Sequence, residues 1–117
     1  MKIKKERKGK SAAIVAYFTI FGSILALLLN SDENKTDFGS FHVRQGLGIN
    51  LVFIFLGVVV NGIFDFLSET QNIMVGFAFY LFYFILWIYG FIAAVSGKKR
   101  EIPIIGNLSQ KIFKNLT

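Results

Sequence analysis

The chain contains no cysteine, which excludes disulfides, thiolate metal sites and cysteine nucleophiles. Histidine is nearly absent as well. The single histidine, His42, has no cluster of carboxylates near it in the sequence, and no serine or acid is spaced to form a catalytic triad with it. The sequence therefore predicts a protein that is not an enzyme, with no catalytic residue, no metal site and no cofactor.

Charge is missing from long stretches of the chain. Apolar residues make up 54% of the 117 residues and charged residues only 17%, and the charges lie at the two ends and in the segments between apolar runs. Three uncharged runs, residues 12–29, 46–64 and 73–97, are long enough to cross a hydrocarbon core of roughly 30 Å as helices. No carboxylate lies within these runs, which argues against a proton-coupled transporter.

These runs predict an all-α integral membrane protein with three transmembrane helices. Residues 1–10 form a basic head, residues 11–97 a three-helix transmembrane domain, and residues 101–117 an amphipathic tail. Apolar residues of the tail recur at nearly helical spacing with Lys111 and Lys114 between them, which indicates a helix lying at the membrane surface. The predicted location is the cell membrane, a bacterial inner membrane, which the chain crosses several times.

The net charge of +6 comes mainly from basic clusters that flank the apolar runs. Such clusters bind anionic lipid head groups, whereas a nucleic-acid partner is excluded because no basic soluble domain is present. With three crossings and a cytoplasmic N-terminus, six Lys and Arg residues lie inside and seven outside. The basic head favours this orientation and the tail favours the reverse, so the orientation stays open.

Small and polar residues on one face of the first run, Ala16, Thr19 and Ser23 among them, predict either a helix-packing seam or a polar groove. Asn50 and Asn61 are amides in or near the second run, where interhelical hydrogen bonds are favoured over substrate contacts.

The entry to the second run carries three adjacent polar side chains. His42, Arg44 and Gln45 lie where a long cation can reach lipid phosphate, so they are interpreted as structural or lipid-anchoring residues, with docking of a partner as the alternative.

Two short motifs resemble a known family. Residues 38–47 follow the pattern F-x-x-F-H-x-R-Q-x-L, and residues 97–105 follow G-x-x-x-E-I-P-x-I, with Glu101, Ile102 and Pro103 at its centre. The chain thereby resembles small bacterial membrane proteins of unknown function that are similar to the twenty-kilodalton component of the chloroplast inner-envelope import translocon. The plastid proteins have four spans, of which the first would be missing here. The resemblance implies that the His42–Arg44 loop and the tail are cytoplasmic and the basic head is outside.

Two functions follow from these observations as hypotheses. The first is a non-enzymatic membrane protein that assembles with itself or with other membrane subunits, as an import-like accessory subunit of protein translocation or insertion. The alternative is a small homo-oligomeric channel or permeability factor built around the faces of Thr19, Ser23 and Asn61.

Overall fold

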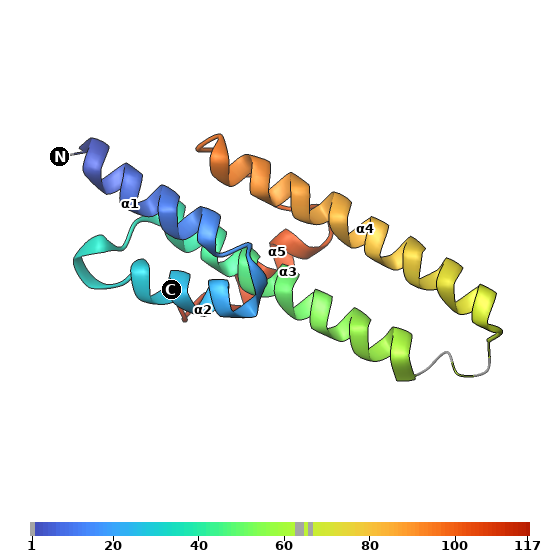
Figure 1. Ribbon diagram of the computed structural model, residues 1–117. Helices are drawn as coiled ribbons and strands as arrows, with labels where there is room; N and C mark the ends of the chain where they lie inside the picture. The colour runs from blue at the N-terminus through green and yellow to red at the C-terminus, as the bar shows by residue number, and fades with distance from the viewer. Residues whose placement is uncertain (1, 63–64, 66) are drawn as a thin grey trace.

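The computed structural model describes residues 2–62, 65 and 67–117, and it is helical throughout (Figure 1). The elements in chain order are α1 (Lys2–Val15), α2 (Thr19–Leu29), the short 3-10 helix η1 (Asp32–Asn34), α3 (Asp37–Gly62), α4 (Glu69–Val95) and α5 (Ile105–Ile112). The described residues contain no strand. The predicted all-α class is therefore confirmed.

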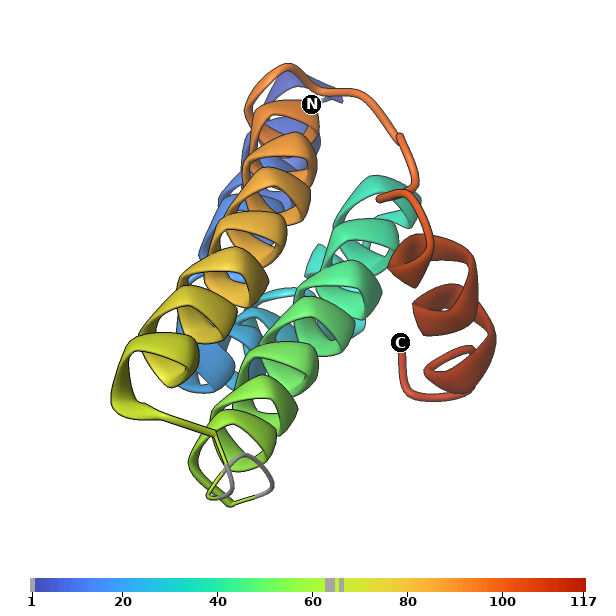
Figure 2. The ribbon, with the colours of Figure 1, turned by 90° about the vertical axis from the view of Figure 1, so that its right-hand side faces the viewer.

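The two longest helices, α3 and α4, lie side by side and run in opposite directions (Figures 1 and 2). They have 26 and 27 residues, which corresponds to about 40 Å each at 1.5 Å per residue. Both are long and apolar enough to cross a membrane. Ser68 begins α4 with a capping box, in which Ser68 and Gln71 each bond the other's backbone N–H.

The first apolar run, residues 12–29, does not form the single spanning helix that the sequence predicted. Helix α1 ends at Val15 and α2 begins at Thr19, whose φ of 54° lies in the left-handed region. The chain reverses there, so that α2 returns toward the end of the molecule from which α1 came (Figure 1). At 11 residues, α2 is about 16 Å long, roughly half of a hydrocarbon core.

The tail also differs from the predicted surface helix over residues 101–117. Only residues 105–112 are helical, as α5, and this helix packs on α3. Its small residues make the contact: Gly106 and Ser109 are buried, and a Cβ on Gly48 of α3 would lie 1.8 Å from Ser109 Oγ. The apolar side chains of the tail are left exposed on the other face, namely Ile104, Leu108, Ile112 and Leu116.

The molecule divides along its length into two parts. The part that we call the polar half comprises residues 2–50 and 86–117, and the bare hairpin comprises residues 51–62 of α3 and 69–85 of α4. Every buried residue that the structure describes lies in the polar half, except Gly76. The bare hairpin is a pair of helices with exposed apolar side chains, such as Phe55, Val58 and Phe77, at 65–70% exposure.

Candidate functional site

The turn between α1 and α2 is held by Asn50 of α3. Its Nδ2 lies 3.1 Å from the carbonyl oxygen of Ala16, 2.8 Å from that of Thr19 and 2.7 Å from Ser23 Oγ. Ser23 Oγ in turn donates to the Ala16 carbonyl at 2.7 Å. Carbonyl groups at the C-terminal end of a helix have no donor within that helix, and leaving them unpaired away from water costs several kcal/mol. Asn50 and Ser23 therefore supply the donors that make this turn possible.

Two further contacts fix the same turn. We call this turn between α1 and α2, residues 16–19, the hairpin tip; it is not part of the bare hairpin of α3 and α4. Trp87 of α4 donates its Nε1–H to the Tyr17 carbonyl at 2.8 Å. Gly46 of α3 lets the chain approach closely, because a Cβ at this position would lie 2.3 Å from the Ala16 carbonyl oxygen. The hairpin tip is thus bound to both long helices, about halfway along α3.

A second buried cluster joins α1 and α3 to the segment after α4. The side chains of Tyr17 and His42 are buried, and the Tyr17 hydroxyl lies 2.6 Å from His42 Nδ1. His42 Nε2 lies 2.8 Å from the Lys98 carbonyl oxygen. Because a carbonyl can only accept, Nε2 carries the hydrogen, and Nδ1 accepts from the Tyr17 hydroxyl. The three groups form one directed chain of hydrogen bonds.

Gln45 completes this cluster, and all of its polar hydrogen-bonding groups are used inside the chain. Its Nε2 donates to the Tyr17 hydroxyl at 2.9 Å and to the Arg100 carbonyl at 3.1 Å, while its Oε1 accepts from the Ile102 N–H at 2.6 Å. His42 and Gln45 therefore hold the backbone of residues 98–102 against α3. We call this arrangement the linker clamp.

A third cluster holds the loop between α2 and α3. Asn30 Oδ1 accepts from the Thr36 N–H at 3.1 Å, and Asn30 Nδ2 donates to Ser40 Oγ at 2.9 Å and to Thr117 Oγ1 at 3.2 Å. The Ser40 and Thr117 hydroxyls also lie 3.2 Å apart. The Asn30 side chain thus ties the loop, the first turn of α3 and the tail together.

Arg44 lies beside this third cluster and is half-buried. Its Nη2 donates to the Thr117 carbonyl and its Nη1 to Gln110 Oε1 at 3.3 Å. Gln110 Nε2 donates to the Phe41 carbonyl at 2.8 Å. Arg44 Nε is buried without a hydrogen-bond partner among the described residues.

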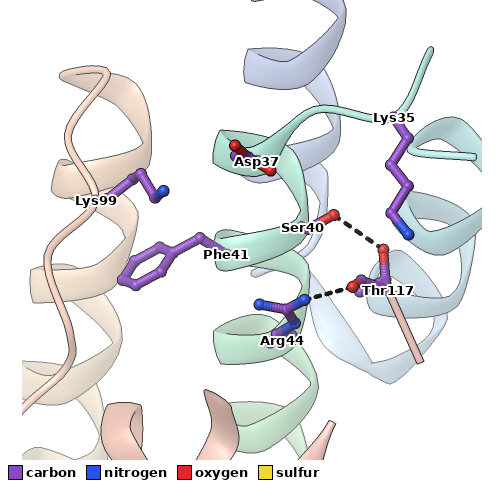
Figure 3. Close-up of a pocket in the computed structure, with 7 residues that line it drawn as sticks. All are labelled: Lys35, Asp37, Ser40, Phe41, Arg44, Lys99 and Thr117. Carbon is purple, nitrogen blue, oxygen red and sulfur yellow. Dashed lines mark hydrogen bonds between the residues drawn. The ribbon is translucent and has the colours of Figure 1, made fainter. Parts of the chain in front are cut away.

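A pocket of about 280 Å³ opens at the start of α3, beside the third cluster (Figure 3). We call it the cationic pocket, because three cationic side chains and one carboxylate line it. Figure 3 shows Lys35 and Lys99 on opposite sides of the first turns of α3. The Lys99 ammonium lies 6.0 Å from the centre of the Phe41 ring. The lining residues are Lys35, Asp37, Ser40, Phe41, Arg44, Lys99 and Thr117.

The structure favours the structural alternative for His42 and Gln45 over contact with lipid or a partner. Both side chains are buried at 0% exposure, and their polar atoms bond within the chain. They build the linker clamp instead. Arg44, the third residue of that prediction, is half-buried and lines the cationic pocket.

Of the residues predicted to form a packing seam, a groove or a channel face, Ala16, Thr19 and Ser23 come together around Asn50, whereas Asn61 lies elsewhere. Ala16 and Ser23 are buried, whereas the Thr19 side chain is exposed and only its carbonyl joins the cluster. Asn61 is exposed in the bare hairpin and donates to the Gly57 carbonyl of its own helix at 2.7 Å. Within the part of the chain that the structure describes, Asn61 bonds an acceptor one turn away in its own helix and makes no interhelical hydrogen bond.

The three residues at the centre of the tail motif have different environments. Ile102 is buried at 1% exposure and its N–H enters the linker clamp, whereas Glu101 and Pro103 are exposed. Sequence reasoning assigned no role to Tyr17 or to the indole N–H of Trp87, and it placed Asn30 only on the predicted packing face of the first run. One signal was present for Tyr17, since it is the only one of the four tyrosines outside the third apolar run. The described residues contain no group of three or more His, Cys, Asp or Glu side chains that could hold a metal ion.

Comparison with known proteins gives a family for this chain. Residues 8–109 match the model of the magnetosome magnetite crystal formation protein family. The chain belongs to this family. It is also similar to a UPF0132 membrane protein of Methanocaldococcus jannaschii, with 25% identity over 114 residues, which cover 97% of this chain and 75% of that protein. No solved structure matches the chain. The membrane-protein relative and the two long apolar helices indicate a membrane protein.

The family assignment corrects the resemblance to the plastid import component, which was wrong. Both motifs, residues 38–47 and 97–105, lie within the match to the magnetosome family. The two motifs contact each other in the fold, because His42 and Gln45 of the first motif bind the backbone of the second through hydrogen bonds. The predicted role in protein translocation or insertion is overturned with the resemblance, and the comparisons give no support to a channel.

Proposed function

We propose that this protein is a non-enzymatic, multi-pass protein of a bacterial cell membrane that gathers anionic phospholipids around its polar half. The observation that supports this proposal is the distribution of charge. All 13 Lys and Arg residues belong to the polar half, whereas Asp65 and Glu69 are the charged residues at the opposite end. Lysine and arginine near a membrane surface attract anionic head groups by about 1 kcal/mol each.

In this proposal α3 and α4 cross the bilayer, and the α1–α2 hairpin enters it and returns to the same side. Neither helix of that hairpin is long enough to cross, since α2 has 11 residues and α1 is basic over its first ten positions. The hydrogen bonds from Asn50, Ser23 and Trp87 support a turn within the membrane, because they satisfy the carbonyl groups there.

With two crossings, the distribution of Lys and Arg residues favours one orientation in the membrane, whereas with three crossings it favoured neither. The basic head, the loop of Lys35, the start of α3, the linker after α4 and the tail then all lie on one side. Because cytoplasmic segments carry the excess of Lys and Arg, we assign the polar half to the cytoplasmic side. The opposite side receives only the short connection between α3 and α4.

The bare hairpin is the part that we propose to meet lipid chains and neighbouring membrane proteins, either further copies of this chain or other subunits. Its exposed side chains are apolar, as lipid or another helix requires. The family takes its name from magnetite crystal formation in magnetosomes. Arranging lipids at a membrane surface is a contribution to such a process that needs no active site.

The single tryptophan provides the test of lipid gathering. Trp87 lies in the polar half, so its fluorescence can transfer energy to labelled lipids near that half. We expect stronger transfer to acyl-labelled phosphatidylglycerol than to equally labelled phosphatidylcholine in mixed vesicles. The excess should shrink when Lys2, Lys4, Lys5 and Lys8 are changed to Gln. Equal transfer to the two lipids would contradict the proposal.

A further inference from the structure

We infer that the cationic pocket is a binding site for one phosphate group, carried either by a phospholipid head group or by soluble phosphate. The inference deepens the proposed function and rests on it, because it names one specific site within the polar half. It depends on Lys35 and Arg44, which flank the start of α3, and on Lys99 of the linker after α4, because all three line the same pocket.

The charge of the pocket suits a phosphate. Three cationic side chains and one acidic side chain, that of Asp37, line it, and neither the Lys35 nor the Lys99 ammonium makes a hydrogen bond or an ion pair with the residues whose side chains the structure describes (9–62, 65 and 67–117). A guanidinium has five N–H donors, and Arg44 uses two of them for Thr117 and Gln110. Cationic donors therefore remain for an anionic oxygen, and guanidinium groups match phosphate geometry well.

Both lysines lie on backbone that partly buried hydrogen bonds with His42, Gln45 and Asn30 hold in place. Lys99 lies between the carbonyls of Lys98 and Arg100, which the linker clamp binds. Lys35 precedes Thr36, whose N–H is bound by Asn30. A site whose donors are positioned before the ligand arrives loses less conformational entropy on binding.

The size and position of the pocket favour a small head group. Its volume of about 280 Å³ is near the lower limit of small-molecule pockets, roughly 300 Å³. It opens at the first turns of α3, where a two-crossing arrangement puts lipid phosphates. The Ser40 and Thr117 hydroxyls on its wall offer additional hydrogen-bonding groups.

The test compares two double variants with the same loss of charge. Lys35→Gln with Lys99→Gln changes the pocket, and Lys111→Gln with Lys114→Gln changes exposed lysines of the tail that do not line it. Binding to detergent-solubilised full-length protein is titrated with phosphatidylglycerol by native mass spectrometry and with inorganic phosphate by thermal shift. Both variants should fold, because all four side chains are exposed.

We expect one saturable ligand, and an affinity about tenfold lower or more for the pocket variant, with little change for the tail variant. Binding of phosphatidylglycerol identifies the source as a lipid, and binding of inorganic phosphate alone identifies it as soluble phosphate. Equal losses in the two variants, or no saturable binding of either probe, would overturn the inference. Because this measurement uses no bilayer, its failure is separate from a failure of lipid gathering in vesicles.

Discussion

The two long helices, α3 and α4, run through both the polar half and the bare hairpin, yet different interactions stabilise these two parts. In the polar half, α3 is surrounded by other segments and ten of its residues, between Gly39 and Asn50, are buried. In the bare hairpin, α3 meets only α4, through ring contacts such as Phe53 with Tyr80 and Tyr83. The described residues of the bare hairpin include one buried residue, Gly76.

The difference shows what a small membrane protein needs at each depth. Two continuous helices satisfy their own backbone and need only apolar side chains outside, because lipid is as apolar as they are. The polar half contains an interrupted helix and two loops, whose free backbone groups need donors and acceptors from elsewhere. Asn30, Gln45 and Asn50 supply these groups, so amide side chains carry the tertiary structure here.

The largest effect that we expect is the difference in stability between substitutions of two asparagines of α3, Asn50 and Asn61. Asn50→Leu leaves the Ala16 and Thr19 carbonyls with fewer donors in a buried place, and it should lower the free energy of unfolding by about 2–4 kcal/mol. Asn61→Leu removes only a bond within its own helix and should cost less than about 0.5 kcal/mol. Reversible unfolding by SDS in mild detergent, followed by circular dichroism, measures both. Equal losses in the free energy of unfolding of the two variants would contradict the distinction between the polar half and the bare hairpin.

Replacing either of two glycines of α3 by alanine should change the stability of the protein, and we expect the two changes to be opposite in sign. Gly46→Ala pushes a methyl group against the Ala16 backbone and should destabilise by about 1–3 kcal/mol. Gly57→Ala meets only the Tyr80 hydroxyl at an ordinary 3.6 Å and should stabilise by up to about 1 kcal/mol through helix propensity. The comparison of melting temperatures in detergent reports the sign. A stabilising Gly46→Ala would mean that α1 does not approach α3 so closely.

The smallest effect that we expect is the difference in stability between substitutions of two tyrosines, Tyr17 and Tyr89. Tyr17→Phe removes a buried hydroxyl that bonds His42 and Gln45, and it should cost about 1–2 kcal/mol and speed hydrogen exchange at the Ile102 amide. Tyr89→Phe changes an exposed side chain and should alter stability by less than about 0.5 kcal/mol. Unchanged exchange at Ile102 in Tyr17→Phe would show that the linker does not depend on the clamp.

The sequence predicts the two long helices well, because each contains a charge-free run of sufficient length. It does not predict the break at residues 16–19, since no glycine or proline marks it. The break depends on Asn50 and Trp87, which lie 34 and 70 residues from their partners at the hairpin tip. The candidate site is predicted only in part. Arg44 stood out beside an apolar run and Lys35 lies two residues before α3, whereas Lys99 reaches the pocket only through the fold.

The central claim is that the α1–α2 hairpin returns to the side from which it enters. The absence of native cysteines permits single-cysteine variants, and Lys10→Cys, Glu33→Cys and Thr70→Cys place exposed thiols in α1, after α2 and in the first turn of α4. Labelling with a membrane-impermeant maleimide in intact cells and in inverted vesicles should reach the first two only from the cytoplasmic side and the third only from outside. Labelling of Lys10→Cys and Glu33→Cys from opposite sides would contradict the account, because residues 12–29 would then cross the membrane.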